Sequence, residues 1–456
     1  MNKKSTVDLI HGPILPSLLS FAFPILLSNI FQQLYNTADI LIVGRFLGPD
    51  SLAAVGATTA IFDLIIGFAL GVGNGMGVVI ARYYGARNFS KIKEAVAATW
   101  ILGALLSVIV MAIGFVGLYP LLQYLETPAE ILPQSYEYIS MIVSCVGVSF
   151  AYNLFAGLLR SVGDSLAALG FLVFSALVNV ALDLYFITQL QLGVQSAGLA
   201  TIISQGLSAL LCFFYIRRSV PELLPSLKHF KWNKALYVDL LEQGLAMGMM
   251  GSIVSVGSVI LQSSVNSFGA VIISAQTAAR RIMAFALLPM TSISASITTF
   301  TSQNYGAKRP DRIVQGLRIS SRLSMSWAAF VCIFLFFASP ALVSFLASST
   351  DSYLVENGTL YLRISSTFYP ILSLLLIYRN CLQGLGQKLL PLVSSFIELI
   401  GKIAFVAWII PWSGYLGVIF CEPLIWLAMT IQLYFSLFKH PWIKEGKKLL
   451  LSGVKS

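Results

Sequence analysis

The stretch from Asn29 to Gly48 reads NIFQQLYNTADILIVGRFLG and holds one carboxylate, Asp39, inside a long apolar run. A charge at that depth costs at least a few kcal/mol, so residues of this kind usually mark functional sites. Asn29, Gln32, Asn36 and Asp39 recur at steps of three and four, which places them on one face of a helix bordered by Tyr35. The pattern predicts a membrane helix whose polar face meets water or protein. A buried seam of a helix bundle is the alternative.

The composition indicates an integral membrane protein. The chain has 456 residues, of which 57% are hydrophobic and only 11% are charged. Soluble domains carry about 25% charged residues. The net charge of +10 does not indicate nucleic-acid binding, because the basic residues gather in particular loops. The three histidines lie outside the apolar segments, so we expect no metal site built from histidine in the membrane.

Twelve segments are long and apolar enough to cross a bilayer as helices, which takes about 20 residues each. A membrane β-barrel would show short alternating segments instead. We therefore expect an all-α membrane protein with spans near 15–43, 53–80, 95–118, 134–156, 167–188, 196–216, 238–265, 273–301, 316–338, 356–379, 389–410 and 415–437.

Lysine and arginine gather in every second loop between these spans, which places them on one side of the membrane. One side carries Lys3, Lys4, Arg82, Arg87, the loop 217–237, Lys308, Lys388 and the tail from Lys439 to Lys455, whereas acids such as Asp50, Glu126 and Asp351 gather on the other. Because basic loops stay in the cytoplasm, we predict a multi-pass protein of the plasma (inner) membrane with both termini cytoplasmic.

The chain also repeats internally. Tyr84-Gly85-Ala86-Arg87 after span 2 returns as Tyr305-Gly306-Ala307-Lys308 after span 8, and the turns ending at Gly163 and Gly386 match in the same order. Six spans per half is an even number, so both halves enter the membrane in the same orientation, related by a pseudo-two-fold axis along its normal. We predict an N-terminal lobe (1–216), a cytoplasmic linker (217–237), a C-terminal lobe (238–437) and a cytoplasmic tail (438–456).

The acids are not repeated with the scaffold, since Asp39 corresponds to Ile260 and Asp183 to Val406. In span 5, Asn179 and Asp183 share a helix face, as Thr201 and Gln205 do in span 6. Asp39, Asp183 and Thr201 each lie six residues, or about 9 Å, from the outer end of their span.

Two carboxylates, an amide and a hydroxyl at one depth suit a proton or a Na⁺ ion, which would relieve the repulsion between the acids. The alternative is a fixed network of hydrogen bonds with a purely structural role. Pro24, inside span 1, is either a static bend or a hinge that responds to Asp39.

Other membrane charges remain open at this level. Asp63 joins the site or pairs locally. Glu398 and Lys402 are spaced to neutralise each other, with a role in the site as the alternative, and we expect Glu422 to face the cavity of the second lobe. Arg280 reaches outward or meets an acid. The alternating glycines from Gly71 to Gly77 indicate close helix packing or flexibility rather than a nucleotide loop. The absence of a Walker-type loop argues against ATP as the direct energy source.

These motifs resemble the multidrug and toxic compound extrusion (MATE) transporters over nearly the whole chain. The resemblance rests on Pro24, on Ala38-Asp39 with Val43-Gly44-Arg45, and on Ala81-Arg82 with Gly85-Ala86. Leu159-Arg160 with Gly163-Asp164, and Asn179 with Asp183, complete it. It implies two six-helix lobes around a V-shaped central cleft that opens alternately to each side, exporting amphipathic or cationic drugs against H⁺ or Na⁺.

By position, the resemblance assigns ion coupling to Asp39, Asn179, Asp183 and Thr201, and substrate contacts to Gln32, Tyr35 and Asn153. We also predict substrate contacts for Asn36, on the polar face of span 1, and for Gln205, on the face of span 6 that carries Thr201. The chain departs from the family at Ala246, where proline is common, and its span 7 has no acid beyond Asp239 and Glu242 at its start. These departures favour coupling in the first lobe, as in the DinF-like branch.

We therefore expect a monomeric secondary active antiporter, not an enzyme, that needs no cofactor beyond its coupling ion and acts on small molecules. A flippase for lipid-linked sugars would need a more basic cavity to meet phosphate. A membrane-embedded prenyl transferase would need paired Asp-rich motifs for Mg²⁺-diphosphate, which are missing. A purely structural protein would not explain Asp39 together with Asp183.

Overall fold

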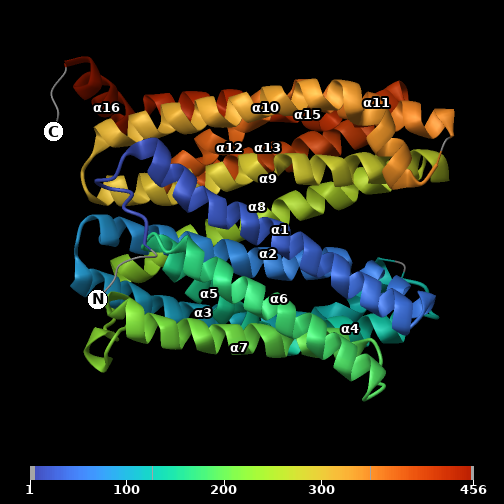
Figure 1. Cartoon of the computed structure of the whole chain (residues 1–456), viewed down its shortest axis with the longest axis horizontal. Helices are drawn as coiled ribbons and strands as arrows, with labels where there is room; N and C mark the ends of the chain where they lie inside the picture. Colours follow the sequence, from blue (N-terminus) through green and yellow to red (C-terminus); the bar gives the residue numbers. More distant parts are fainter. Residues whose placement is uncertain (1–5, 126, 350, 453–456) are drawn as a thin grey trace. The chain divides into compact units, whose positions relative to one another are not determined.

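The structure is a computed structural model that describes residues 6–125, 127–349 and 351–452, and these residues form helices and turns without strands. Lys3, Lys4, Glu126 and Lys455, used above for orientation, lie outside them. The long helices are α1 (Ile14–Phe46), α2 (Pro49–Gly85), α3 (Phe89–Tyr124), α6 (Ser165–Thr188), α7 (Gln195–Ser219), α8 (Lys234–Asn266), α9 (Ala270–Gly306), α10 (Pro310–Ala347) and α15 (Tyr415–Lys439) (Figure 1).

The shorter helices complete the chain. They are α4 (Leu132–Ser144), α5 (Val146–Ser161), α11 (Ser352–Thr367), α12 (Tyr369–Gly384), α13 (Leu389–Ala404), α14 (Ile410–Ser413) and α16 (Pro441–Ser452). Two 3₁₀ turns, η1 (Pro221–Leu223) and η2 (Leu227–His229), lie in the predicted linker, and a π-helical segment, η3 (Phe405–Ile409), joins α13 to α14.

Ten stretches of the described chain are long and apolar enough to span a membrane, and two bent helix pairs raise this to twelve. The bent pairs are α4 with α5, at 51°, and α11 with α12, at 52°. They coincide with the predicted fourth and tenth spans, so the twelve-span prediction is confirmed, while the bends themselves were not foreseen. Pro370 opens α12 and accounts for one break, but Cys145 breaks the other without a proline.

The internal repeat is visible in the backbone. Left-handed conformations occur at matching positions of the two halves: Gly48 and Gly269 (φ 90° and 86°), Gly163 and Gly386 (90° and 78°), and Arg87 and Lys308 (52° and 57°). Glycine is the usual residue where φ is positive because it has no Cβ to clash. The paired turns predicted from sequence thus adopt the same local structure in both halves.

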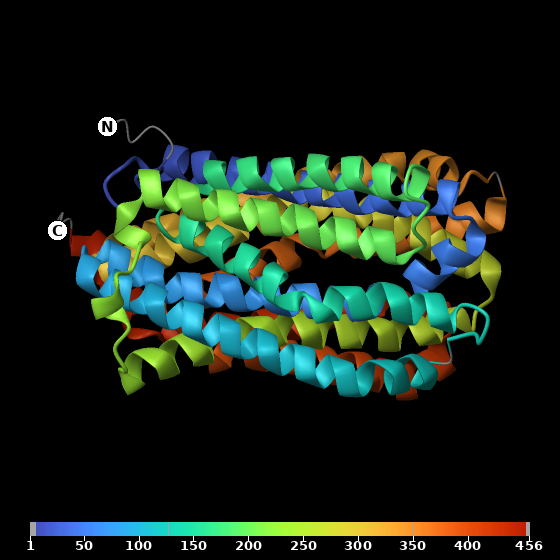
Figure 2. The same cartoon turned by 90° about the horizontal axis from the view of Figure 1, so that it is seen from below.

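Two compact units divide the described chain. The first unit contains Leu27–Ser252 and the described residues before Asp8, and the second contains Asp8–Leu26 and Ile253 onward. Within each unit the axes of the long helices lie roughly parallel to one another (Figures 1 and 2). The division falls inside α1, just after Pro24, and inside α8. The predicted lobe boundaries stay a prediction.

The alternating glycines of α2 pack against two other helices of the first unit. A Cβ on Gly71 or Gly75 would lie 2.6 Å or 2.4 Å from backbone atoms of α8, and one on Gly73 or Gly77 would lie 2.7 Å or 3.0 Å from backbone atoms of α5. Such close approach leaves no room for a larger residue. The packing interpretation of this motif is confirmed.

Candidate functional site

The polar face of α1 begins the site in the first unit. Gln32 donates from Nε2 to Oδ1 of Asn36 at 3.3 Å, one turn further along the same face. Tyr35 extends from the edge of this face to α7, where its hydroxyl lies 3.0 Å from Oγ1 of Thr201. The three- and four-residue spacing in α1 places its polar side chains on one face. Tyr35, at the edge of that face, connects α1 to α7, which is far away in the sequence.

Thr201 is a shared acceptor for two donors. Its hydroxyl donates to the carbonyl of Ala197 at 2.9 Å, one turn back in α7. Because the hydroxyl has only one proton, its lone pairs remain for Tyr35 and for Nδ2 of Asn179, which lies 3.3 Å away in α6. Thr201 thus joins three helices through side-chain hydrogen bonds.

Asp39 of α1 and Asp183 of α6 interact directly through their carboxyl groups, and Tyr35 also neighbours Asp39. Asp183 and Asn179 are wholly buried. Two ionised carboxylates have no hydrogen to share, so this contact becomes a hydrogen bond only when one proton is held between them. The structure brings all four predicted ion-coupling residues together.

Several buried oxygens of this cluster have no hydrogen-bond donor among the described residues. They are Oδ1 of Asp39, Oδ1 of Asn179 and both carboxylate oxygens of Asp183. Burying an acceptor without a partner costs free energy, and burying an ionised one costs more. A proton or a hard cation bound to oxygen ligands would satisfy them, and the set of carboxylate, amide and hydroxyl oxygens suits either one.

The remaining predicted substrate residues form a second polar group in the same unit. Ser149 of α5 donates to Oε1 of Gln205 at 2.6 Å, and its carbonyl accepts from Nδ2 of Asn153 at 2.8 Å. Asn153 is buried, whereas Gln205 is partly exposed. The structure brings Asn153 and Gln205 together through Ser149, which the sequence reading had not selected.

Tyr138 of α4 is another residue that the sequence reading missed. It is buried and lies within electrostatic reach of Asp39, Asp183 and Asp63. Tyrosines are frequent in this sequence, so its type gave no signal, and the bend between α4 and α5 was not predicted. Asp63 itself is exposed on α2.

A family model described as MatE matches residues 24–185 and 246–408, more than two thirds of the chain and one segment in each half. The chain belongs to the MatE family. The first matched segment includes Pro24, Asp39, Asn179 and Asp183, whereas Thr201 lies beyond it. The fold and the family that the motifs implied are therefore confirmed.

Relatives of this MatE chain match it over almost its full length. A "Probable multidrug resistance protein YoeA" of Bacillus subtilis is 27% identical, with 94% of each chain covered. An "FAD transporter" of Shewanella oneidensis is 25% identical, covering 95% of this chain and 96% of its own. A solved structure described as MATE in the bent conformation shares the fold, with a TM-score of 0.88 at 22% identity over 98% of this chain and 99% of that one.

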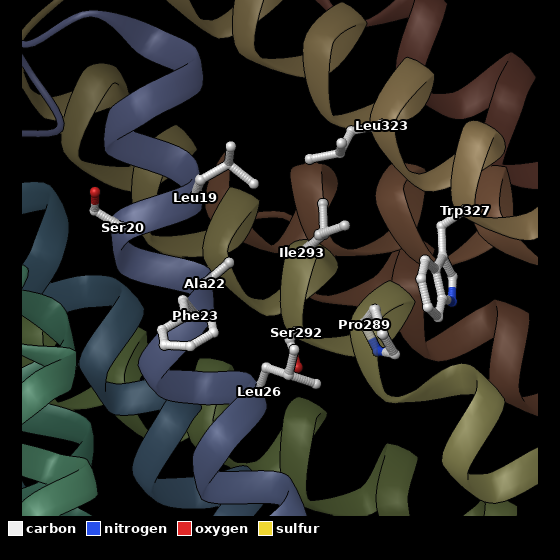
Figure 3. Close-up of a pocket in the computed structure, with 10 residues that line it drawn as sticks. All are labelled: Leu19, Ser20, Ala22, Phe23, Leu26, Pro289, Ser292, Ile293, Leu323 and Trp327. Carbon is white, nitrogen blue, oxygen red and sulfur yellow. The ribbon is translucent and has the colours of Figure 1, made fainter.

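The second unit of the MatE chain holds an apolar cavity of about 530 Å³ (Figure 3). Side chains from the first half of α1, from α9 and from α10 line it, including Phe23, Pro289 and Trp327. Pro289 lacks an N–H and so breaks the hydrogen-bond pattern of α9. Nε1 of Trp327 donates to the carbonyl of Ala286 at 2.9 Å, which satisfies an acceptor beside that break.

The second unit also contains a buried network of charges. Nζ of Lys402 lies 2.9 Å from Oε1 of Glu398 and 3.5 Å from Oε1 of Glu422. Arg280 contacts the same oxygen of Glu422 at 3.3 Å, and Tyr361 donates to its other oxygen at 3.3 Å. The predicted Glu398–Lys402 pair is confirmed, but it is part of a larger set that draws in Arg280 and Glu422.

Arg160 and Asp164 lie at the turn between α5 and α6. Arg160 donates to Oδ1 of Asn74 at 2.9 Å, and Asp164 caps α6 by accepting from the backbone N–H of Ala167 at 3.1 Å. Tyr215 also donates to Asp164, at 2.7 Å. These contacts give both residues a structural role at the turn.

Proposed function

We propose that this protein is a secondary active multidrug antiporter that exports amphipathic or cationic compounds in exchange for H⁺ or Na⁺. The observation that carries the proposal is the Asp39–Asp183 pair, whose buried oxygens have no donor among the described residues. A protein without an exchangeable cation would leave this charge uncompensated. The multidrug resistance names of its relatives support the substrate class.

The exchange follows from competition for these carboxylates. In the outward-facing state a proton, or Na⁺ on the same oxygens, binds between Asp39 and Asp183, and the affinity for drug falls. After drug release the protein turns inward and the cation leaves to the cytoplasm. Hydrogen bonds from Tyr35 and Asn179 to Thr201 tie α1, α6 and α7 together beside the two acids.

The proposed drug contacts are Gln32, Tyr35, Asn36, Asn153 and Gln205, which offer amide and phenol groups on α1, α5 and α7. Pro24 is the proposed hinge of α1, and the boundary between the two units lies only two residues beyond it. The protein would act as a monomer in the cell membrane with both termini in the cytoplasm, without a cofactor and without enzymatic chemistry.

An anionic substrate is the rival reading, raised by the relative named as an FAD transporter and by the flippase alternative. Such a substrate needs cations free to meet phosphate. Two cations of the second unit, the partly exposed Arg280 and the buried Lys402, already contact carboxylates. This pairing favours a cationic or neutral substrate.

Drug efflux from whole cells or inverted vesicles tests the proposal, with pH and Na⁺ gradients imposed separately. Collapse of efflux when only one gradient is dissipated identifies the coupling ion. Asp39→Asn should abolish efflux at unchanged expression, while Asp50→Asn, an exposed acid at the start of α2, should retain it. Full transport by Asp39→Asn would refute the scheme.

A further inference from the structure

The charge network of the second unit is built around one ammonium group. Lys402 is 1% exposed, and three oxygens surround its Nζ: those of Glu398 at 2.9 Å, Glu422 at 3.5 Å and Ser258 at 3.5 Å. They come from α13, α15 and α8 respectively. This is the ligand set of a buried cation site, with the cation supplied by the protein's own chain.

The surroundings make room for this lysine. A Cβ on Gly257 of α8 would lie 3.0 Å from Cδ of Lys402, so the missing side chain leaves space for the lysine stem. The π-helical segment η3 begins at Phe405, three residues after Lys402. Segments of this kind are often found at functional sites.

Further charges face the same carboxylates. Arg280 of α9 contacts Glu422, and Arg379 of α12 lies within electrostatic reach of Glu398. Tyr361 of α11 donates to Glu422, and Tyr415 lies within electrostatic reach of Arg280. Arg280 can neutralise Glu422, whereas Lys402 is the only cation in ion-pair contact with Glu398 among the described residues, so Glu398 depends on Lys402 for its counter-charge.

We propose that Lys402 is a tethered counter-ion that occupies a cation site of the second unit and closes it to H⁺ and Na⁺. The exchangeable cation then binds only in the first unit, and Lys402 sets the number of coupling cations at one. The effect of Lys402 on transport rests on the proposed function. Whether Glu398 and Glu422 bind a proton or Na⁺ can be measured without transport.

Lys402→Met tests the proposal, because methionine keeps an unbranched stem and removes the charge. The full-length protein is purified into lipid nanodiscs, and the probes are H⁺ and Na⁺ themselves. We expect the variant to bind two cations where the wild type binds one, measured as ²²Na⁺ bound or as a new infrared band of a protonated carboxyl group. Adding Glu398→Gln should remove the extra site. A folded Lys402→Met protein with the wild-type cation count and spectrum would overturn the proposal.

A second measurement leaves Lys402 unchanged, in case the first variant does not fold. The double variant Asp39→Asn/Asp183→Asn should lose all stabilisation of the folded state by Na⁺ or by carboxyl protonation within the membrane. Cation-dependent stabilisation that survives in it, and disappears when Glu398→Gln is added, would show an open site in the second unit and overturn the proposal.

The two proposals fail separately. If the first-unit acids prove unnecessary for drug efflux, the proposed function fails, yet the infrared comparison of wild type with Lys402→Met still reports whether Lys402 closes the second site. If that comparison shows no difference while Asp39→Asn abolishes efflux, only the tethered counter-ion is lost.

Discussion

Each unit of the protein holds a pair of carboxylates among its helices, and the two pairs are neutralised in opposite ways. In the first unit, Asp39 and Asp183 contact each other, and neither oxygen of Asp183 has a donor among the described residues. In the second unit, Lys402 bridges Glu398 and Glu422, and Arg280 also contacts Glu422. One pair requires a cation from outside, and the other holds cations that are part of the chain.

The difference shows that a repeated backbone does not imply repeated chemistry. The halves share their unusual turns and their bent helix pairs. The acids, however, lie on α1 and α6 in the first unit and on α13 and α15 in the second. A scaffold with two similar halves can therefore use one half for ion exchange, while the acids of the other half are neutralised by lysine and arginine side chains of the protein itself.

Exchanging an acid for its amide in each unit should give the largest contrast. Asp183→Asn removes the partner of Asp39, so drug efflux should fall to the level of vesicles without the protein. Glu422→Gln leaves the first-unit pair intact, so the protein that folds should keep efflux with the same ion dependence. Efflux measured per folded molecule checks both. The comparison breaks if Glu422→Gln changes the coupling ion.

The free energy of unfolding, unlike efflux, should depend strongly on the ion pair of the second unit. Lys402 has a side-chain exposure of 2%, and removing one partner of a buried ion pair typically costs about 3–5 kcal/mol. We expect Lys402→Met to lower the free energy of unfolding by this amount, and Glu398→Leu/Lys402→Met to lower it less, since both charges then disappear together. Reversible unfolding in detergent measures the difference.

An exposed lysine provides the control for that measurement. Lys448→Met, on the surface of α16, should change the free energy of unfolding by no more than about 0.5 kcal/mol. If the double variant is no more stable than Lys402→Met alone, then Lys402 does not act chiefly as the partner of Glu398.

The sequence predicted which residues belong to these two clusters better than it predicted which residues contact each other across helices. Helical spacing placed Asn179 with Asp183 and Glu398 with Lys402, because residues four apart share a face. Depth along the spans placed Asp39, Asp183 and Thr201 at one level. The contact of Glu422 with Lys402 depends on how α13 packs against α15, which spacing along either helix does not encode.

The same limit explains the residues that were missed. Tyr138 reaches the first-unit acids from α4, next to a bend at Cys145 that has no proline to announce it. Ser149 was one serine among many until α5 and α7 brought it against Gln205. Local patterns fix which face of a helix is polar, but tertiary packing decides which faces meet.

A smaller change should sharpen the description of the first unit. Thr201→Val keeps the shape of the side chain but removes the acceptor shared by Tyr35 and Asn179. Leaving buried donors unsatisfied costs about 1–3 kcal/mol. A loss toward the lower end of that range would weaken the apparent affinity for the coupling ion about tenfold, because about 1.4 kcal/mol corresponds to a factor of ten. The ion dependence of efflux measures this shift.

Thr37→Val is the matched control, since Thr37 is exposed on α1 and its hydroxyl donates only to the carbonyl of Gln33 in its own helix. Its ion affinity should equal that of the wild type. Equal affinities for Thr201→Val and the wild type would show that Thr201 does not position the acids.

The smallest expected effect concerns a second asymmetry between the halves, the proline inside α9 that α2 lacks. Trp327→Phe keeps an aromatic ring in the cavity but removes the N–H that meets the carbonyl of Ala286 beside Pro289. One such hydrogen bond contributes about 1 kcal/mol, so unfolding should become easier by that amount, with efflux unchanged. Trp408→Phe, at a tryptophan that is 76% exposed, should not change stability. Equal stability of Trp327→Phe and the wild type would mean that the break at Pro289 needs no support from α10.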